Sequence, residues 1–231
     1  MAKLNRSMFS MFIVLLSLSF VALGNEVTNA DFQAFYFIQQ WLGSYCNQRG
    51  TTCCYPPTGK PAADFTVFGL WPYFTDGTFP HDCAGASTDV DPLKPLEGGL
   101  HTAWPSCTCP QIGRKFWLHE WNKHGTCSKS VLDEIPYLQA AINLKSKINL
   151  LQALEKAGIR PDNREYALGS IKQAISSAFG FDPWIQCNQN SQGNNQIWQI
   201  SLCVDNTGNN LIRCPNIPQS NCAPSVQFPS F

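Results

Sequence analysis

The cysteines constrain this chain more than any other feature of its sequence. There are eleven: Cys46, Cys53, Cys54, Cys83, Cys107, Cys109, Cys127, Cys187, Cys203, Cys214 and Cys222. In an oxidising compartment such a set predicts a disulfide framework, and an odd number leaves one thiol over. Zinc is the competing interpretation, because Cys107 and Cys109 are close together and histidines lie nearby. The chain has no paired C-x-x-C ligand sets, so we expect disulfides and no metal.

The N-terminus indicates which compartment applies. Two basic residues precede an uncharged apolar run over 8–23, and Ala22 and Gly24 supply small residues at positions −3 and −1 of a cleavage site. This layout is typical of a secretory signal peptide. The run is short for a membrane anchor of roughly 20 residues, and no stop-transfer charges follow it. We predict a signal peptide over 1–24, with cleavage after Ala30 as the alternative, and no membrane segment in the remaining chain.

The mature chain, 25–231, is predicted to form one domain. Its length of about 207 residues allows a sizeable core, and the 7 Trp and 15 Phe of the sequence suit a well-filled interior. Basic and acidic residues number 16 each, and two of the basic ones precede residue 8, so the mature chain is near −2. A general nucleic-acid binder carries a large basic surplus instead. If RNA is a ligand, a local site must bind it.

Hydrophobic periodicity predicts a mixture of strands and helices. Three segments read as strands, the last of them half-buried: 31–41, 65–71 and 198–203. Two segments read as helices that end at glycine caps, 137–157 before Gly158 and 164–178 before Gly180. The elements do not alternate as βαβ units. The sequence therefore predicts an α+β fold with a central, largely antiparallel sheet flanked by helices.

The residues that could carry chemistry gather in one segment, FWLHEWNKHGTC, at 116–127. On a helix of about 100° per residue, His119, Glu120, Lys123 and His124 fall within an arc of roughly 140°, so all four can line one side of a cleft. A solvated polar face with i,i+4 contacts is the simpler interpretation. It would pair His119 with Lys123, two groups of like charge, for no gain.

Among catalytic sites, the spacing disfavours a zinc protease. That chemistry requires histidines at i and i+4, whereas these lie at i and i+5 with a lysine between them. The cluster suits an anion, in particular a phosphate whose charge grows in the transition state. A neutral histidine beside it could take a proton from an attacking hydroxyl near neutral pH. A metal-free phosphate-ester site is the resulting hypothesis.

Two segments carry a resemblance to a known family. FWLHEWNKHGTC resembles the second active-site segment of the T2 ribonucleases, and FTVFGLWP at 65–72 resembles the first, which usually has histidine before Gly-Leu-Trp-Pro. The similarity runs from Phe35 to Phe231 and looks most like the plant S-like branch. It also includes QQW at 39–41, CCYP at 53–56, KPAAD at 60–64, PWIQC at 183–187 and the closing FPSF. The resemblance implies a single T2-ribonuclease-type domain.

The resemblance also implies a pairing of the cysteines. The family's disulfides carry over as Cys46–Cys53, Cys54–Cys109, Cys83–Cys127, Cys187–Cys222 and Cys203–Cys214. Cys107 falls where the family pattern has no cysteine. It is the expected free thiol, although Cys107 and Cys109 could exchange roles, and a dimer bridged through Cys107 is conceivable.

By resemblance, each residue of the cluster has a role in cleaving RNA through a 2′,3′-cyclic phosphate, without metal or cofactor. His124 removes the 2′-hydroxyl proton, and His119 holds the phosphate. Glu120 and Lys123 stabilise the charged phosphorus. The positions that match RNA-contacting residues of the cleft are Gln40, Phe116, Trp117, His119 and Lys123.

One position departs from the family pattern. The histidine that protonates the departing 5′-oxygen is replaced by Phe68, and a phenyl ring has no proton to give. General acid catalysis is worth about 10²–10⁴-fold, so we expect little ribonuclease activity. His81 and His101 are the other two histidines, and neither falls in a family catalytic segment. A substitute acid among them stays open as an alternative.

An impaired site of this kind resembles the ribonuclease-like vegetative storage proteins of plants. The expected function is therefore nitrogen storage in plant tissue, in the secretory pathway, either extracellular or vacuolar. An amide-rich segment at 188–199 is compatible with storage. Two alternatives stay open: an attenuated but active endoribonuclease, and a protein that binds RNA weakly or another ligand without cleavage.

Overall fold

The computed structural model describes residues 32–74, 77–110 and 113–231. The predicted signal peptide, 1–24, lies outside these residues. Within them, no helix is both long and apolar enough to cross a membrane.

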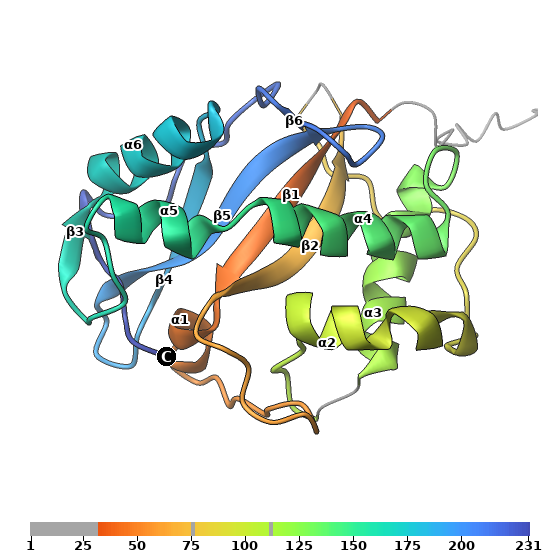
Figure 1. Cartoon of the computed structure of the whole chain (residues 1–231), viewed down its shortest axis with the longest axis horizontal. Helices are drawn as coiled ribbons and strands as arrows, with labels where there is room; N and C mark the ends of the chain where they lie inside the picture. Colours follow the sequence, from red (N-terminus) through yellow and green to blue (C-terminus); the bar gives the residue numbers. More distant parts are fainter. Residues whose placement is uncertain (1–31, 75–76, 111–112) are drawn as a thin grey trace, which may run out of the picture.

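A seven-stranded sheet forms the centre of the molecule (Figure 1). Its path runs β2-β1-β5-β7-β3, and β4 and β6 also pair with β5. All pairs are antiparallel except β5 with β7. The strands are β1 (Ala34–Trp41), β2 (Phe65–Tyr73), β3 (Glu165–Ala167), β4 (Trp184–Gln189), β5 (Asn195–Asp205), β6 (Leu211–Ile212) and β7 (Ser225–Gln227). The predicted α+β class with a largely antiparallel sheet is confirmed.

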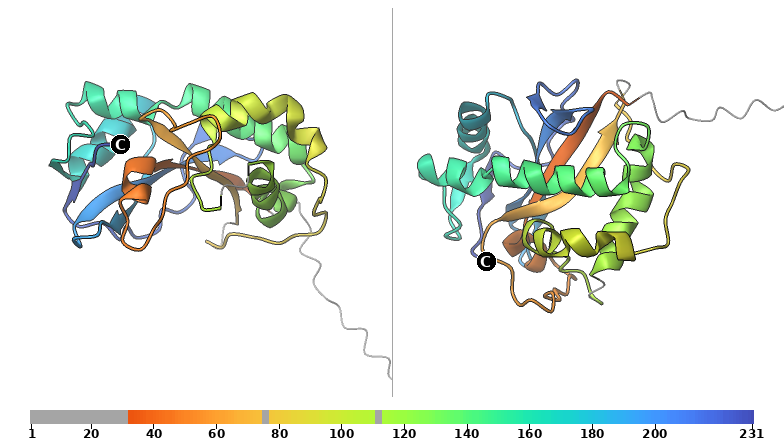
Figure 2. Two further views of the ribbon diagram at one scale, coloured as in Figure 1. Left: turned by 90° about the horizontal axis from the view of Figure 1, so that it is seen from below. Right: turned by 45° about the vertical axis from the view of Figure 1, so that its right-hand side comes forward.

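Helices flank this sheet. In Figure 1, α4 and α5 lie end to end across one face, and α2 and α3 lie beyond the β2 edge. The edge-on view in Figure 2 shows α4 and α5 as a layer on one side of the strands. The helices are α1 (Leu42–Cys46), α2 (Glu97–Ala103), α3 (Arg114–Lys123), α4 (Glu134–Lys147), α5 (Leu150–Lys156) and α6 (Leu168–Phe179), with 3-10 turns η1 (Asp91–Leu96) and η2 (Gly125–Ser128).

Strand β1 has side chains in two separate clusters. Phe35 and Phe37 join the main core under the helices. Tyr36 and Ile38 point to the opposite face, because successive side chains of a strand alternate. There they meet Tyr73 and the half-buried rings of the outer aromatic cluster, defined here as Phe68, Trp71, Phe79 and Trp184. Because both faces of the sheet are covered, the whole of β1 is buried.

Because both faces of the sheet are covered, the prediction that β5 is half-buried is wrong. Alternation predicted a half-buried strand, but Gln199 is only 3 % exposed and Ser201 is fully buried. They lie opposite Gln40 and Ile38 of β1 on the outer face. Polar side chains on this strand therefore do not mark a solvent-facing side.

The single helix predicted over 137–157 is wrong. The chain forms two helices, α4 and α5, separated at Ile148 and Asn149. Ile148 leaves helical geometry with ψ 86°, and its carbonyl oxygen accepts a hydrogen bond from Gln39 Nε2 at 3.3 Å. Asn149 then caps α5 by accepting from the backbone N–H of Gln152.

The second predicted helix, 164–178, begins later than expected. Its first residues form β3, which pairs with β7, and α6 starts only at Leu168. The end agrees with the prediction, because Gly180 takes the left-handed conformation of a glycine cap with φ 80°.

The structure contains the five disulfides that the family resemblance implies. Cys107 is free and 3 % exposed, and burial raises the pKa of its thiol to about 11. Its carbonyl oxygen accepts a hydrogen bond from Cys54 N at 2.9 Å. A covalent dimer through Cys107 remains a prediction, and it would require this side chain to leave the interior.

Candidate active site

Helix α3 carries the predicted cluster to the edge of the sheet. Trp117 and Trp121 bury one side of the helix in the core, each 1 % exposed. His119 and Lys123 lie on the exposed side. The helix ends at Lys123, and His124 is its C-cap, with its backbone N–H donating to Glu120 O at 3.0 Å. The predicted arc therefore includes three residues of the helix and one residue just beyond it.

The turn after His124 depends on Gly125. A Cβ atom at this position would lie 2.2 Å from the Trp121 ring and 3.0 Å from that of Tyr137. Only a residue without a side chain lets the chain pass these two buried rings. The close approach continues the chain into η2 and keeps His124 against the sheet.

His124 is held by an aromatic neighbour rather than by a hydrogen bond. Its ring stacks on Trp71 of β2, with centroids 4.5 Å apart and planes at 22°. His124 is 8 % exposed, and its Nδ1 has no hydrogen-bond partner among the described residues. Burial, with the charges of Lys123, His119 and His81 in addition, lowers the pKa of His124 to about 4, against a smaller opposing effect of Asp82. The imidazole is therefore neutral at pH 7 and able to accept a proton.

Burial also shifts the pKa of Glu120, in the opposite direction from that of His124. Burial raises the pKa of its carboxyl group to about 7, although Trp71 and Lys123 partly oppose the shift. Its Oε2 atom is buried with no hydrogen-bond partner among the described residues. A proton-accepting imidazole and a carboxyl group that titrates near neutrality thus lie one helical turn apart.

These shifts predict a pH dependence of stability. Because the pKa of Glu120 is raised, the folded protein binds more protons than the unfolded chain between about pH 4.5 and 7. The contribution of Glu120 to the free energy of unfolding therefore falls as pH rises through this range. His124 acts oppositely, and its contribution is lost as pH falls from 6.5 towards 4. We expect Glu120→Gln to gain stability relative to wild type by up to about 3 kcal/mol as pH rises through this window.

The measurement is the free energy of unfolding in urea at several pH values between 4.5 and 7. Glu155→Gln, which changes an exposed carboxyl group of α5, is the matched control. Parallel pH curves for wild type and Glu120→Gln would contradict a raised pKa at Glu120.

Phe68 lies at a β-bulge. Val67 pairs with Gln39 and Gly69 with Ile38, so Phe68 is an extra residue in β2 with no partner on β1. Its ring contacts Trp71 and Trp198, with centroid distances of 5.6 and 6.0 Å. Bulges re-aim side chains and are frequent beside active sites.

Trp198 is likewise the extra residue of a bulge, in the pairing of β5 with β4. Two irregularities far apart in sequence therefore place two aromatic rings against each other on the outer face. Phe68 therefore packs against two indole rings, those of Trp71 and Trp198.

The predicted nucleotide-contacting residues divide into two sets. Gln40 lies on the outer face, 7 % exposed, beside Thr66 of β2 and Gln199 of β5. Its Oε1 is buried and has no hydrogen-bond partner among the described residues.

Phe116 and Trp117 lie away from this face. Phe116 is half-buried beside Trp104, with ring centroids 6.4 Å apart. Trp117 belongs to the core, and its indole N–H donates to Trp104 O at 2.8 Å. The structure does not bring Trp117 to an accessible surface.

The structure brings to the site one segment that lies outside both family motifs, the segment of His81 and Asp82. Asp82 donates its backbone N–H to Lys123 O at 2.7 Å, and the neighbouring Cys83 forms a disulfide with Cys127. His81 Nδ1 lies 2.6 Å from Asp82 Oδ2. The signal was the Cys83–Cys127 pairing, since Cys127 follows His124 by three residues.

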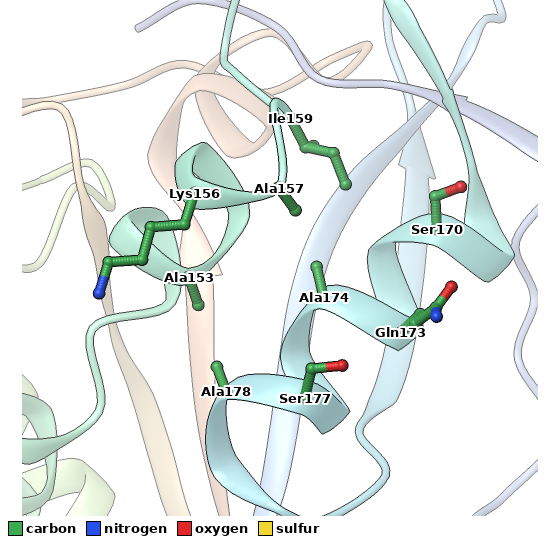
Figure 3. Close-up of a pocket in the computed structure, with 9 residues that line it drawn as sticks. All are labelled: Ala153, Lys156, Ala157, Ile159, Ser170, Gln173, Ala174, Ser177 and Ala178. Carbon is green, nitrogen blue, oxygen red and sulfur yellow. The ribbon is translucent and has the colours of Figure 1, made fainter.

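The described residues contain no group of three His, Cys, Asp or Glu side chains that could hold a metal ion. A groove of about 470 Å³ lies elsewhere, between α5 and α6 (Figure 3). It is lined mainly by small side chains, among them Ala153, Ala174 and Ser177, and Lys156 is its one charged residue.

Comparison with known proteins places this arrangement in a family. The model of the Ribonuclease T2 family matches residues 32–214. The chain is 50 % identical to ribonuclease 1 of Arabidopsis thaliana, over 88 % of this chain and 89 % of that protein. It is 46 % identical to the extracellular ribonuclease LE of Solanum lycopersicum, over 98 % and 99 %. A ribonuclease-like storage protein of Panax ginseng is 28 % identical, over 91 % and 87 %.

The fold is shared as well. The crystal structure of RNase NT in complex with 5′-AMP superposes with a TM-score of 0.81 at 46 % identity, covering 87 % of this chain and all of that one. Since the family model spans most of the described chain and relatives at 46–50 % identity match nearly end to end, this protein belongs to the ribonuclease T2 family.

Proposed function

We propose that this protein is a secreted T2-family member with strongly reduced ribonuclease activity that serves plant tissue as a nitrogen store. The observation that carries the proposal is the position of Phe68. Its ring has no ionisable proton and packs against other aromatic rings on the outer face. The rest of the predicted site supports one half of a cleavage reaction.

The half that remains is the attack on phosphorus. The neutral imidazole of His124 takes the proton of a ribose 2′-hydroxyl, and the 2′-oxygen attacks the adjacent phosphate. Lys123 supplies positive charge to the phosphate and His119 holds it, and both side chains are exposed. Glu120 stabilises the crowded phosphorus through its carboxyl group. All four roles follow from the family motif at 116–127.

The missing half is departure of the 5′-oxygen. An alkoxide that leaves without a proton is a poor leaving group, and general acid catalysis is worth about 10²–10⁴-fold. Acid and base act in one step, so losing the acid also removes most of the benefit of the base. A protein with this site still receives RNA but turns it over slowly.

Storage is supported by two further features. Five disulfides constrain the unfolded chain and favour a protein that persists. The Panax ginseng relative carries the name of a ribonuclease-like storage protein. The predicted signal peptide and the disulfides favour the secretory pathway, with the cell exterior or the vacuole as destination.

The direct test is RNA cleavage by the purified mature chain beside a family member that has histidine at the position of Phe68. We expect the present protein to be at least about tenfold slower at equal concentration, because it lacks the general acid. Equal rates would overturn the proposal. Storage is tested separately by abundance, which should rise and fall with season in the organ where the protein accumulates.

The second candidate function is an attenuated, metal-free endoribonuclease that yields 2′,3′-cyclic phosphates. It is favoured by the 50 % identity to a protein named as a ribonuclease and by the neutral, stacked His124. The rate of RNA cleavage, relative to that of the histidine-bearing family member, decides between the two candidates. Titration with RNA, compared with the His119→Ala variant, detects weak binding without cleavage.

A further inference from the structure

His81 lies close to the remnant site although it belongs to neither family motif. The ring of Trp71 contacts three others: Phe68 at 5.6 Å, Phe79 at 5.9 Å and His124 at 4.5 Å between centroids. One indole therefore touches the position of the missing acid, the predicted base and the segment that carries His81. Only Pro80 separates Phe79 from His81.

The segment Phe79–Cys83 is fixed at both ends. Phe79 packs in the outer aromatic cluster, against Tyr36 and Tyr73 at 5.3 Å each. At the other end, the backbone of Asp82 is bonded to Lys123 O and Cys83 is joined to Cys127. Asp82 has φ 54°, a left-handed conformation that a tight connection imposes. Two anchors on either side of one histidine limit how far its side chain can move.

The orientation of the imidazole follows from its neighbour. His81 Nδ1 lies 2.6 Å from Asp82 Oδ2. In a protonated ring, Nδ1–H therefore donates a hydrogen bond to the carboxylate, and Nε2–H is left without a partner on Asp82. His81 also interacts electrostatically with His124 and contributes to lowering the pKa of that residue. Asp82 also interacts electrostatically with Lys123 and His124. The side chain of His81 is 62 % exposed, so a bound substrate can reach the imidazole.

From this geometry we infer that His81 is a substitute general acid, positioned by Asp82, and that it supports the residual RNA cleavage of this protein. The reaction balances without a co-reactant. His124 takes the 2′-hydroxyl proton, and the bond from the 2′-oxygen to phosphorus forms. The bond from phosphorus to the 5′-oxygen breaks, and His81 Nε2 gives its proton to that oxygen. The products are a 2′,3′-cyclic phosphate and a 5′-hydroxyl, with the proton now on His124 and returned through water.

The inference rests on the proposed function in one respect, namely that RNA still enters the remnant site. The two proposals are tested by different rate comparisons. The proposed function concerns the rate of wild type relative to a histidine-bearing relative, whereas this inference concerns how the rate depends on His81 and on the leaving group.

The test compares two substrates on the full mature protein. A dinucleoside monophosphate has an alkoxide leaving group that needs a proton. A uridine 3′-(4-nitrophenyl phosphate) releases a stable phenolate that needs none. We expect His81→Ala to slow the dinucleotide at least about tenfold and to change the aryl ester by less than about twofold. Asp82→Asn should slow the dinucleotide by a smaller factor with the same preference, since it only positions the imidazole.

Three outcomes would overturn the inference. One is equal dinucleotide rates for wild type and His81→Ala. Another is an equal loss on both substrates, because His81 would then bind substrate or hold the loop instead of donating a proton. A wild-type dinucleotide rate no higher than that of His124→Ala would also exclude a working acid, yet it would leave the proposed storage function intact.

Discussion

Replacing Phe68 by histidine should raise RNA cleavage by the purified protein at least about tenfold, towards the 10²–10⁴-fold that general acid catalysis is worth. The reason is local. The two rings have similar shape, so the bulge of β2 can accept the change without a large packing penalty. His124, Glu120 and Lys123 are already present, and only the proton donor is restored. The measurement is the initial rate of RNA hydrolysis by wild type and variant.

Two controls identify the origin of the gain. Phe79→His places the same new ring against the same indole, Trp71, but outside the position of the acid, and should give no comparable increase. Adding His124→Ala to Phe68→His should abolish the gain, because the base is then missing. A folded Phe68→His variant that stays as slow as wild type would show that the cleft no longer holds RNA for cleavage.

Removing the Cys83–Cys127 disulfide should cost about 4 kcal/mol of stability. In the chain-entropy model the cost follows the length of the closed loop, and these cysteines are 44 residues apart. Cys46–Cys53, only 7 residues apart, is the matched control, with an expected cost of about 2.4 kcal/mol. The measurement is the free energy of unfolding in denaturant for the double serine variants.

This comparison has a second readout. Loss of Cys83–Cys127 also frees one anchor of the segment that carries His81, whereas loss of Cys46–Cys53 does not touch it. Cleavage of the dinucleotide should therefore fall in the first variant and stay unchanged in the second. Equal destabilisation by the two removals would contradict the entropic account.

Local patterns in the sequence predicted what depends on neighbouring residues. The apolar run that became β1 and the glycine that ends α6 both act within one element, and both are found where they were expected. The break between α4 and α5 depends on a distant residue. Ile148 fits a helical pattern, but its carbonyl bonds to Gln39, more than a hundred positions away. No local signal reports such a bond.

The candidate site shows the same division. The residue types at 119–124 predict a phosphate-ester site, because their chemistry is visible in the sequence. Their environments were not visible. The burial of Trp117 depends on Trp104, the stacking of His124 depends on Trp71, and the bulge at Phe68 depends on its pairing with β1. The segment of His81 is tied to the site by the Cys83–Cys127 disulfide, which the family resemblance implied but no local pattern around His81 indicated.

The buried thiol of Cys107 bears on how the chain acquires its disulfides. Before folding, Cys107 and Cys109 are nearly equivalent partners for Cys54, since only one residue separates them. Exchange between them requires a thiolate, and burial keeps Cys107 protonated and away from solvent once the fold has formed. Folding therefore fixes one of two near-identical pairings, and the isomer that forms during folding is the isomer that the folded protein keeps.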